Sequence, residues 1–397
     1  MTQPQTRTAD STGPMAWIYD SRLRAIVAQT VVVGAIAWVL WYLADNTQEN
    51  MAKRGMSTGF DFVFGTAGFD ISWSLFEVKA GSTYLTVFKV GIVNTLVVSV
   101  LSIVCATLLG FFVGLMRLSS NWLVARIAAW YIEILRNTPL LLQILFWFIG
   151  VFTGLPPPRQ SYQPIEGFVL NNRGFFLPSP VPEDGLWMTG VAVLVAVVAA
   201  VLLHRWARAR QAATGERFPS VLAGIGIAFA LPAGVFLATG SPLDWNVPKL
   251  RGFNFVGGMM VPPAFCALLI ALSVYTSCFI AEMVRAGIQS VSHGQTEAAY
   301  ALGVKPTWTM RLIVIPQAMR AIIPPLISSY LNVTKNSSLA VAIGYPDLVA
   351  VWMQTSLNQS GRAIEIVATT MLFYMTCSLF ISILLNVYNR RMQLRER

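Results

Sequence analysis

A polar stretch inside an apolar run holds the side chains best suited to binding a small charged molecule. Lys335 lies near the middle of a run long enough to cross a membrane. A charge at that depth is costly and usually faces a cavity or a partner. Its neighbours add amide and hydroxyl groups: Asn332, Asn336, Ser337 and Ser338. This set could line a pathway and bind a carboxylate, or it could stabilise an interface between two membrane subunits. The sequence leaves both interpretations open.

Arg136 is a second candidate for the same pathway. It precedes Thr138 and Pro139, where the chain enters an apolar segment. The alternative is an anchor at the membrane surface, with the guanidinium group bonded to Glu133 or to a phosphate. Both interpretations remain open for this arginine too.

Catalytic chemistry is not indicated elsewhere in the sequence. Paired carboxylates and histidine clusters do not occur within the apolar runs, and the four cysteines inside these runs are interpreted as small apolar side chains. The sequence has no Gly-x-x-x-x-Gly-Lys-[Ser/Thr] loop to hold the phosphates of ATP. We therefore expect no catalytic residues, no metal and no cofactor on this chain.

The composition places the chain in a membrane. Of its 397 residues 55% are hydrophobic and 12% are charged, whereas a soluble domain carries roughly a quarter charged residues. The net charge of +10 comes in short clusters between apolar runs and not along one basic face. We therefore do not expect nucleic-acid binding.

Eight apolar runs approach or exceed the length that crosses a bilayer, if an adjoining segment completes the short third run. They are Ala25–Ala44, Val90–Met116, Pro139–Val151, Leu186–Leu203, Val221–Ala238, Val261–Val284, Ala321–Ile343 and Ala363–Val387. Lysine and arginine concentrate in alternate connecting segments and in the tail after Asn389. By the positive-inside rule, both termini are predicted to be cytoplasmic.

The segments between these runs differ in character. Residues 45–87 interleave aromatic residues with glycine and aspartate, which predicts an extramembrane segment with an interfacial stretch. Residues 122–136 carry charges and are predicted to lie at or below the cytoplasmic surface. Residues 154–185 and 240–258 are rich in proline and glycine and are predicted to be loops.

A short helix is predicted between the sixth and seventh runs. Residues 296–302 are mostly good helix formers. Ser292 with Gln295 fits a capping box, and Gly303 fits a helix stop with a sharp turn that a side chain would obstruct. Ala298 and Leu302 lie one turn apart on one face, where a partner surface could approach closely.

This segment resembles the signature loop of the permeases of ATP-binding-cassette (ABC) importers. The pattern is Glu-Ala-Ala, three residues, Gly, nine residues, Ile-x-Leu-Pro; it is matched from Glu297 to Pro316, except that Ile315 replaces leucine. The resemblance implies a coupling helix that contacts a separate ATPase chain, which binds ATP and magnesium. The residues expected to make this contact are Gln295, Glu297, Ala298, Ala299, Leu302 and Gly303.

Further segments resemble the polar amino-acid (histidine/glutamine-type) permeases of that class. They are Asn94-Thr-Leu, Arg136-Asn-Thr-Pro-Leu-Leu-Leu-Gln143, Ala281-Glu-Met-Val-Arg-Ala-Gly-Ile288, Pro316-Gln-Ala-Met-Arg320 and Lys335-Asn-Ser-Ser-Leu339. The resemblance implies an all-α polytopic membrane protein of the type I importer (MetI-like) fold in a bacterial inner membrane. It also implies these partners: a homologous second permease, two copies of the ATPase, a periplasmic binding protein, an amino-acid substrate and membrane lipids.

The resemblance also suggests an organisation of the chain. The permease core would comprise residues 88–153 and 261–389, with the coupling loop at residues 292–311. Residues 154–260 would be an insertion with two extra spans, as in the longer permease subunit of general L-amino-acid transporters. Residues 1–87 would supply a tail, a first span and a periplasmic segment, and residues 390–397 a basic tail.

The main alternative is a secondary transporter that works alone on an ion gradient. Two observations weigh against it. No strong internal repeat is visible, although such carriers are often built from repeats. A self-sufficient carrier also has no need of a docking helix.

Overall fold

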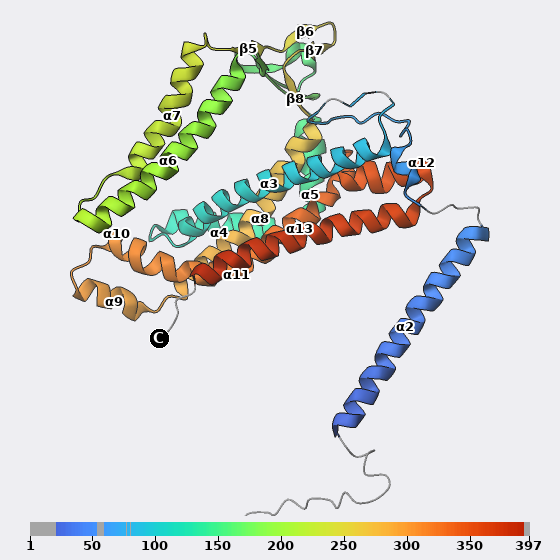
Figure 1. Cartoon of the computed structure of the whole chain (residues 1–397), viewed down its shortest axis with the longest axis horizontal. Helices are drawn as coiled ribbons and strands as arrows, with labels where there is room; N and C mark the ends of the chain where they lie inside the picture. The colour runs from blue at the N-terminus through green and yellow to red at the C-terminus, as the bar shows by residue number, and fades with distance from the viewer. Residues whose placement is uncertain (1–20, 54–58, 77, 80, 393–397) are drawn as a thin grey trace, which may run out of the picture.

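Long apolar helices dominate the computed structural model, which describes residues 21–53, 59–76, 78–79 and 81–392 (Figure 1). Within these residues seven helices are long and apolar enough to cross a membrane. They are α2 (Ser21–Lys53), α3 (Tyr84–Arg117), α6 (Leu186–Thr214), α7 (Ser220–Ala238), α8 (Pro263–Gln289), the continuous helical segment Pro306–Ile343 that contains α11 (Ile315–Asn336), and α13 (Ala363–Met392). A bent pair of shorter helices brings the number of spans to eight if the pair counts as one. The prediction of a helical membrane protein with about eight spans is confirmed, whereas the tails at residues 1–20 and 393–397 lie outside the described residues.

Helices α3 and α8 approach each other closely at two glycines. Gly110 and Gly114 of α3 form a Gly-x-x-x-Gly pattern that faces α8. A Cβ atom at Gly110 would lie 2.6 Å from Cβ of Ile280, and one at Gly114 would lie 2.8 Å from the carbonyl oxygen of Ala281. Side chains at these positions would force the helices apart. Small residues with this spacing allow membrane helices to approach closely.

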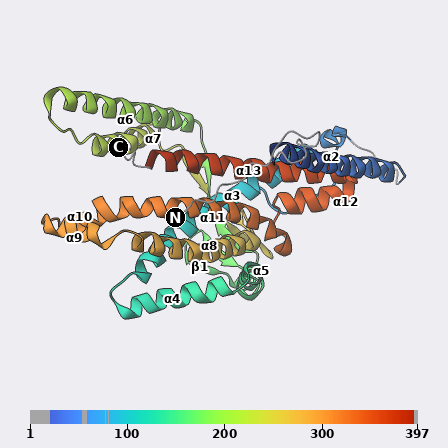
Figure 2. The ribbon, with the colours of Figure 1, turned by 90° about the horizontal axis from the view of Figure 1, so that it is seen from below.

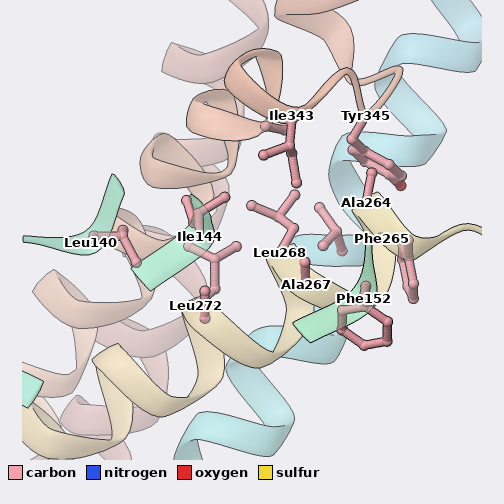
Figure 3. Packing of buried hydrophobic residues seen from close by; sticks show 13 residues of the cluster. Leu140, Ile144, Phe152, Ala264, Phe265, Ala267, Leu268, Leu272, Ile343 and Tyr345 are labelled. Carbon is pink, nitrogen blue, oxygen red and sulfur yellow. The ribbon is translucent and has the colours of Figure 1, made fainter. Parts of the chain in front are cut away.

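The second helix of the bent pair packs against the other half of α8. Helix α5 (Leu140–Leu145) continues as a π-helical segment, Phe146–Phe152. Its buried Leu140 and Ile144 lie beside Leu268 and Leu272 of α8, with Ile343 closing the cluster (Figure 3). This cluster is the main apolar core of the chain.

Helix α4 (Trp122–Asn137) meets α5 at an angle of 103°, which confirms a break between residues 136 and 139. The predicted depth of residues 122–136 stays a prediction, and the structure shows what this helix packs against. The hydroxyl group of Tyr131 lies 2.7 Å from that of Ser277, near the middle of α8. Ala128 and Ile132 also pack against α8, while the large apolar residues Trp130 and Ile134 point outward. Helix α4 thus lies alongside the C-terminal half of α8.

Three aromatic residues of the segment after α2 pack into the bundle. Phe62, in the 3₁₀ turn Asp61–Phe64, stacks on Trp352, and Phe69 packs against Tyr84. Trp73 packs against Phe265 and Tyr345, and its indole nitrogen donates a hydrogen bond of 2.9 Å to the carbonyl of Met260. These three residues cover the end of the core. The interfacial stretch predicted within residues 45–87 stays a prediction.

The two segments predicted as loops contain short antiparallel strands. A four-stranded sheet has the order β1-β2-β3-β8, and the pairs β4-β5 and β6-β7 are separate. The bounds are β1 (Tyr162–Ile165), β2 (Phe168–Asn171), β3 (Gly174–Leu177), β4 (Ser179–Pro182), β5 (Leu243–Asn246), β6 (Lys249–Arg251), β7 (Asn254–Val256) and β8 (Met259–Val261). Each strand has three or four residues, too few for a period-two pattern to stand out. Strands β3 and β8 pair although α6 and α7 lie between them in the sequence, and local sequence cannot reveal such a pairing.

Helices α6 and α7 form a hairpin that extends from the strands beside the bundle, and α2 lies apart from both (Figures 1 and 2). The connections 118–121, 215–219 and 290–292 lie toward the same end of the molecule as the C-terminal end of α13 (Figure 1). Those segments are the ones predicted to be cytoplasmic. We call this end of the bundle the inner end and the opposite end the outer end.

A buried polar network joins α3 to the connection between α11 and α13. This connection contains a 3₁₀ segment (Ser337–Ile343), a π segment (Val349–Ser356) and α12 (Leu357–Ser360). Asn94 donates a hydrogen bond of 2.9 Å to the carbonyl of Pro346, and Tyr345 donates one of 3.1 Å to the carbonyl of Asn94. Fully buried Asp347 accepts a 2.8 Å bond from the backbone of Ala350 with one oxygen, and its other oxygen has no partner within the described residues. Burial raises the pKa of Asp347 to about 7.

The first prediction concerns the cost of ionising Asp347. Its pKa is higher in the folded protein than in the unfolded chain, so wild-type stability falls as the pH rises from about 4 to about 7. In Asp347→Asn this loss is absent. We expect the free energy of unfolding of the variant, relative to that of wild type, to rise by roughly 3 kcal/mol between pH 5 and pH 8. One pKa unit corresponds to about 1.4 kcal/mol.

Thermal unfolding of the purified protein in detergent at both pH values measures this change. The control is Asp70→Asn, which removes an exposed carboxylate. Equal pH dependence in wild type and Asp347→Asn would contradict the prediction.

Candidate functional site

The predicted short helix is α9 (His293–Ala301), and it ends in a Schellman motif. The backbone amide of Gly303 bonds to the carbonyl of Tyr300 at 2.9 Å, and that of Val304 to the carbonyl of Ala299 at 3.0 Å. Gly303 adopts φ = +72°, the left-handed conformation that this motif requires at the residue after the cap. The helix stop predicted at Gly303 is confirmed.

The reason for a glycine at position 303 differs from the expected one. A Cβ atom at Gly303 would meet no other atom within 4 Å, so a side chain would not obstruct the turn within this chain. The constraint comes from the backbone, because the left-handed region costs L-residues about 1–2 kcal/mol. Asparagine tolerates this region better than a β-branched residue does.

The predicted capping box at the start of α9 is wrong. Ser292 is the N-cap, but its side chain makes no capping hydrogen bond. The side chain of Gln295 instead accepts a bond of 3.2 Å from the side chain of Gln317 on α11. Gln295 therefore ties α9 to the start of α11, a contact that local sequence could not reveal.

The outward face of α9 is small and apolar. Ala298 is exposed, and Leu302 is 83% exposed, an unusual fraction for a leucine. Ala299 is buried and anchors the helix from behind, and Glu297 is exposed. The structure thus brings Ala298 and Leu302 to one surface, as predicted.

A hollow of about 550 Å³ lies between α9 and the segment that leads into α11. That segment consists of α10 (Pro306–Thr309) and a π-helical turn (Met310–Val314). Leu302, Leu312 and Pro316 supply apolar walls, and Arg320 lies at the edge. The Nε atom of Arg320 is buried and has no hydrogen-bond partner within the described residues. The hollow therefore combines apolar walls with a cation that could take an acidic partner.

A local ion pair lies just before this segment. The guanidinium group of Arg285 contacts the carboxylate of Glu282 with two nitrogens, and it also donates a bond of 2.5 Å to Gln289. This ion pair braces the last turns of α8 immediately before the coupling segment.

The residues of the polar stretch around Lys335 differ in their exposure in the structure. Lys335 lies in the last turn of α11, about 30 Å from Ile315 along the helix, and the helical segment continues to Ile343. Its position at mid-span stays a prediction. The negative end of the helix dipole favours a cation in this last turn. Lys335 and Asn332 are exposed, and Asn336 and Ser338 are partly buried. Ser337 is fully buried, and its hydroxyl bonds to the carbonyl of Thr334, so it does not line an open surface.

The exposed face of α11 is more polar and contains smaller residues than those of α3 and α13. At a helical spacing it presents Ala321, Pro324, Ser328, Asn332 and Lys335. The exposed faces of α3 and α13 consist instead of large apolar residues, among them Leu108, Phe112, Leu372 and Phe380. Sequence reasoning missed this face as a unit, although the spacing of three and four residues was a usable signal. Helix α11 runs through Pro324 and Pro325 without interruption.

Arg136 lies apart from this face. It occupies the last turn of α4 and is exposed, with its guanidinium group 5.3 Å from the centre of the Phe279 ring on α8. Among the described residues it forms no ion pair with Glu133. The structure therefore does not bring Arg136 and Lys335 together in one site.

Comparison with known proteins identifies the family. Residues 106–394 match the model of the family described as the binding-protein-dependent transport system inner membrane component. The chain belongs to this family. It is therefore a multi-pass, non-catalytic permease subunit of the inner membrane, as predicted, and ATP hydrolysis belongs to a separate chain.

Individual relatives cover nearly the whole permease. It is 47% identical over 380 residues to the general L-amino acid transport system permease protein AapQ of Rhizobium johnstonii, covering 96% of this chain and 95% of the relative. It is 48% identical over 382 residues to the putative amino-acid ABC transporter permease protein YhdX of Escherichia coli, with the same coverage. A glutamate/glutamine/aspartate/asparagine transport system permease protein, BztB of Rhodobacter capsulatus, is 40% identical over 415 residues, covering 96% of each chain.

The second prediction separates backbone strain from side-chain contact at Gly303. In Gly303→Asn the turn is tolerated, and we expect uptake by the complete transport system to stay above half of wild type. In Gly303→Val the left-handed conformation is disfavoured, and we expect at least a tenfold loss of uptake without loss of membrane insertion. Uptake normalised to the amount of inserted permease is the measurement. Equal activity of the two variants would show that the turn itself is not required.

Proposed function

We propose that this permease forms half of the translocation pathway of an ATP-driven importer for L-amino acids. A homologous second permease would supply the other half, and a periplasmic binding protein would deliver the substrate. The support for amino acids as substrates is that the three relatives are described as amino-acid transporter permeases. Their coverage of nearly the whole chain includes the inserted hairpin and strands.

The proposed coupling site is the outward face of α9 with the adjoining hollow. Gln295, Glu297, Ala298, Ala299, Leu302 and Gly303 would form it, with two copies of an ABC ATPase binding ATP and magnesium on the partner side. The observation that carries this proposal is the 83% exposure of Leu302 on a helix held between two spans. Complete burial of such an exposed leucine against a partner would stabilise the complex by about 1.5–3 kcal/mol.

The connections of α9 explain how movement could be transmitted. Helix α9 follows α8 after a three-residue connection and is tied to α11 by the bond between Gln295 and Gln317. A displacement of α9 by its partner would therefore act on two spans at once. When ATP binding draws the ATPase subunits together, these spans would shift from an inward-facing to an outward-facing arrangement.

The proposed substrate pathway runs along the exposed face of α11. Ser328, Asn332 and Lys335 share this face, and exposed polar side chains in a membrane face water or a partner in preference to lipid. Asn336 and Ser338 would extend the face at its outer end. Arg136 and Ser337 are not part of this proposal, because one lies elsewhere and the other is buried.

The third prediction tests the proposed function by reconstitution. Liposomes containing both permeases, the ATPase and the binding protein should accumulate an L-amino acid only when ATP is supplied.

Leu302→Ser should weaken ATPase binding roughly tenfold, because the lost apolar contact is worth about 1–2 kcal/mol. The matched control is Leu222→Ser on α7, also highly exposed but outside the hollow beside α9. Uptake without ATP would favour a carrier that works alone and would contradict the proposal.

The fourth prediction tests the pathway with single cysteines in a variant that lacks the four native cysteines. A cysteine replacing Asn332 should react with a membrane-impermeant thiol reagent, and amino acid should slow the reaction at least threefold. A cysteine replacing Leu372 on α13 should react poorly, because this exposed leucine belongs to a large apolar face. Equal reactivity at the two positions would contradict an aqueous pathway along α11. The companion variant Lys335→Ala would contradict a substrate contact if its uptake and substrate preference were unchanged.

A further inference from the structure

The hairpin of α6 and α7 contains a groove that the proposed transport mechanism does not use. The two helices approach closely where Ala200 faces Gly224. Next to this contact a groove of about 500 Å³ is lined by Val197, Val201, Ile225 and Ala228. His204, Arg205 and Ser220 lie at one end of it, where His204 and Ser220 are 3.1 Å apart through Nδ1 and Oγ. The groove is therefore apolar along its length and polar at one end.

The polar end of the groove has an excess of positive charge. Residues 204–217 contain four arginines and one glutamate. The glutamate, Glu216, pairs with Arg210 at 2.7 Å. Arg205, Arg208 and Arg217 form no ion pair within the described part of the chain, and Arg205 is exposed at the groove itself. Because Glu216 pairs with Arg210, its carboxylate does not compete with an anion for Arg205.

Aromatic residues mark the same end as a membrane boundary. Trp206 and Phe218 pack edge to face with their ring centres 5.7 Å apart, and the guanidinium group of Arg210 lies 5.5 Å from the Trp206 ring. Tryptophan beside arginine is typical of the headgroup region. From Arg205 the groove follows α6 to Val197, eight residues or about 12 Å away, into the apolar part of the hairpin.

We propose that this groove binds an anionic phospholipid of the inner leaflet. The phosphate would lie against the guanidinium group of Arg205, within reach of the Ser220 hydroxyl and the His204 ring. An acyl chain would lie along Val197, Val201, Ile225 and Ala228. The charge favours this occupant, because basic pockets between membrane helices on the cytoplasmic side suit lipid phosphates. A free phosphate would leave the apolar walls unfilled, and an apolar protein helix would leave Arg205 without an anion.

The inference goes beyond the proposed function, and its experiment measures lipid binding instead of uptake. The assembled transporter is placed in phosphatidylcholine nanodiscs with increasing fractions of phosphatidylglycerol, and bound lipid is quantified by native mass spectrometry. We expect the wild-type complex to retain phosphatidylglycerol preferentially. Arg205→Gln and Ala228→Trp should each weaken this retention at least fivefold, the first by removing the cation and the second by filling the groove. Arg205→Lys should keep most of it.

Two matched controls and one crosslink make the result decisive. Arg251→Gln removes an exposed arginine from β6, and Leu222→Trp enlarges an exposed side chain of α7 outside the groove. Both should retain the lipid as wild type does. Equal retention of phosphatidylglycerol and phosphatidylcholine, or no effect of Arg205→Gln and Ala228→Trp, would overturn the proposal. A photoreactive residue at Val201 that crosslinks to another protein subunit instead of to lipid would also overturn it.

Discussion

The close approach of α3 to α8 at Gly110 and Gly114 is the contact around which the bundle is organised. It brings two spans together with no side chain between their backbones at these points, so neither can slide without a clash. Helix α8 in turn packs on α11, where Gly287 faces Ile322. The coupling segment is thus held between two spans whose relative positions are set by packing.

Because α8 and α11 are packed together, α9 is held in a fixed position between them. A helix on a loose loop would move without consequence, whereas α9 is joined to α8 by a short connection and to α11 by a side-chain hydrogen bond. The ion pair of Glu282 and Arg285 braces the last turns of α8 at the same place. A displacement of α9 would therefore act on α8 and α11 together.

The low polarity of the hydrocarbon core explains how the remaining surfaces divide. Apolar faces such as those of α3 and α13 can meet lipid without cost, whereas the face with Ser328, Asn332 and Lys335 requires water or a partner. The buried network around Asp347 follows the same constraint, because most of its polar groups are bonded within the chain. The hairpin of α6 and α7 combines both properties, with an apolar groove that ends among arginines.

The sequence by itself determined the number of spans, the break before Pro139 and the helix that ends at Gly303. These features depend on hydropathy over one segment, or on a few residues at fixed spacing, so they can be found without knowing what lies nearby. Tertiary structure decided the rest: the packing of α4 against α8, the pairing of β3 with β8, the packing of Trp73 in the core and the burial of Ser337 next to the exposed Lys335. Each of these depends on contacts between segments far apart in the chain, and the energy of such contacts is not contained in any single segment.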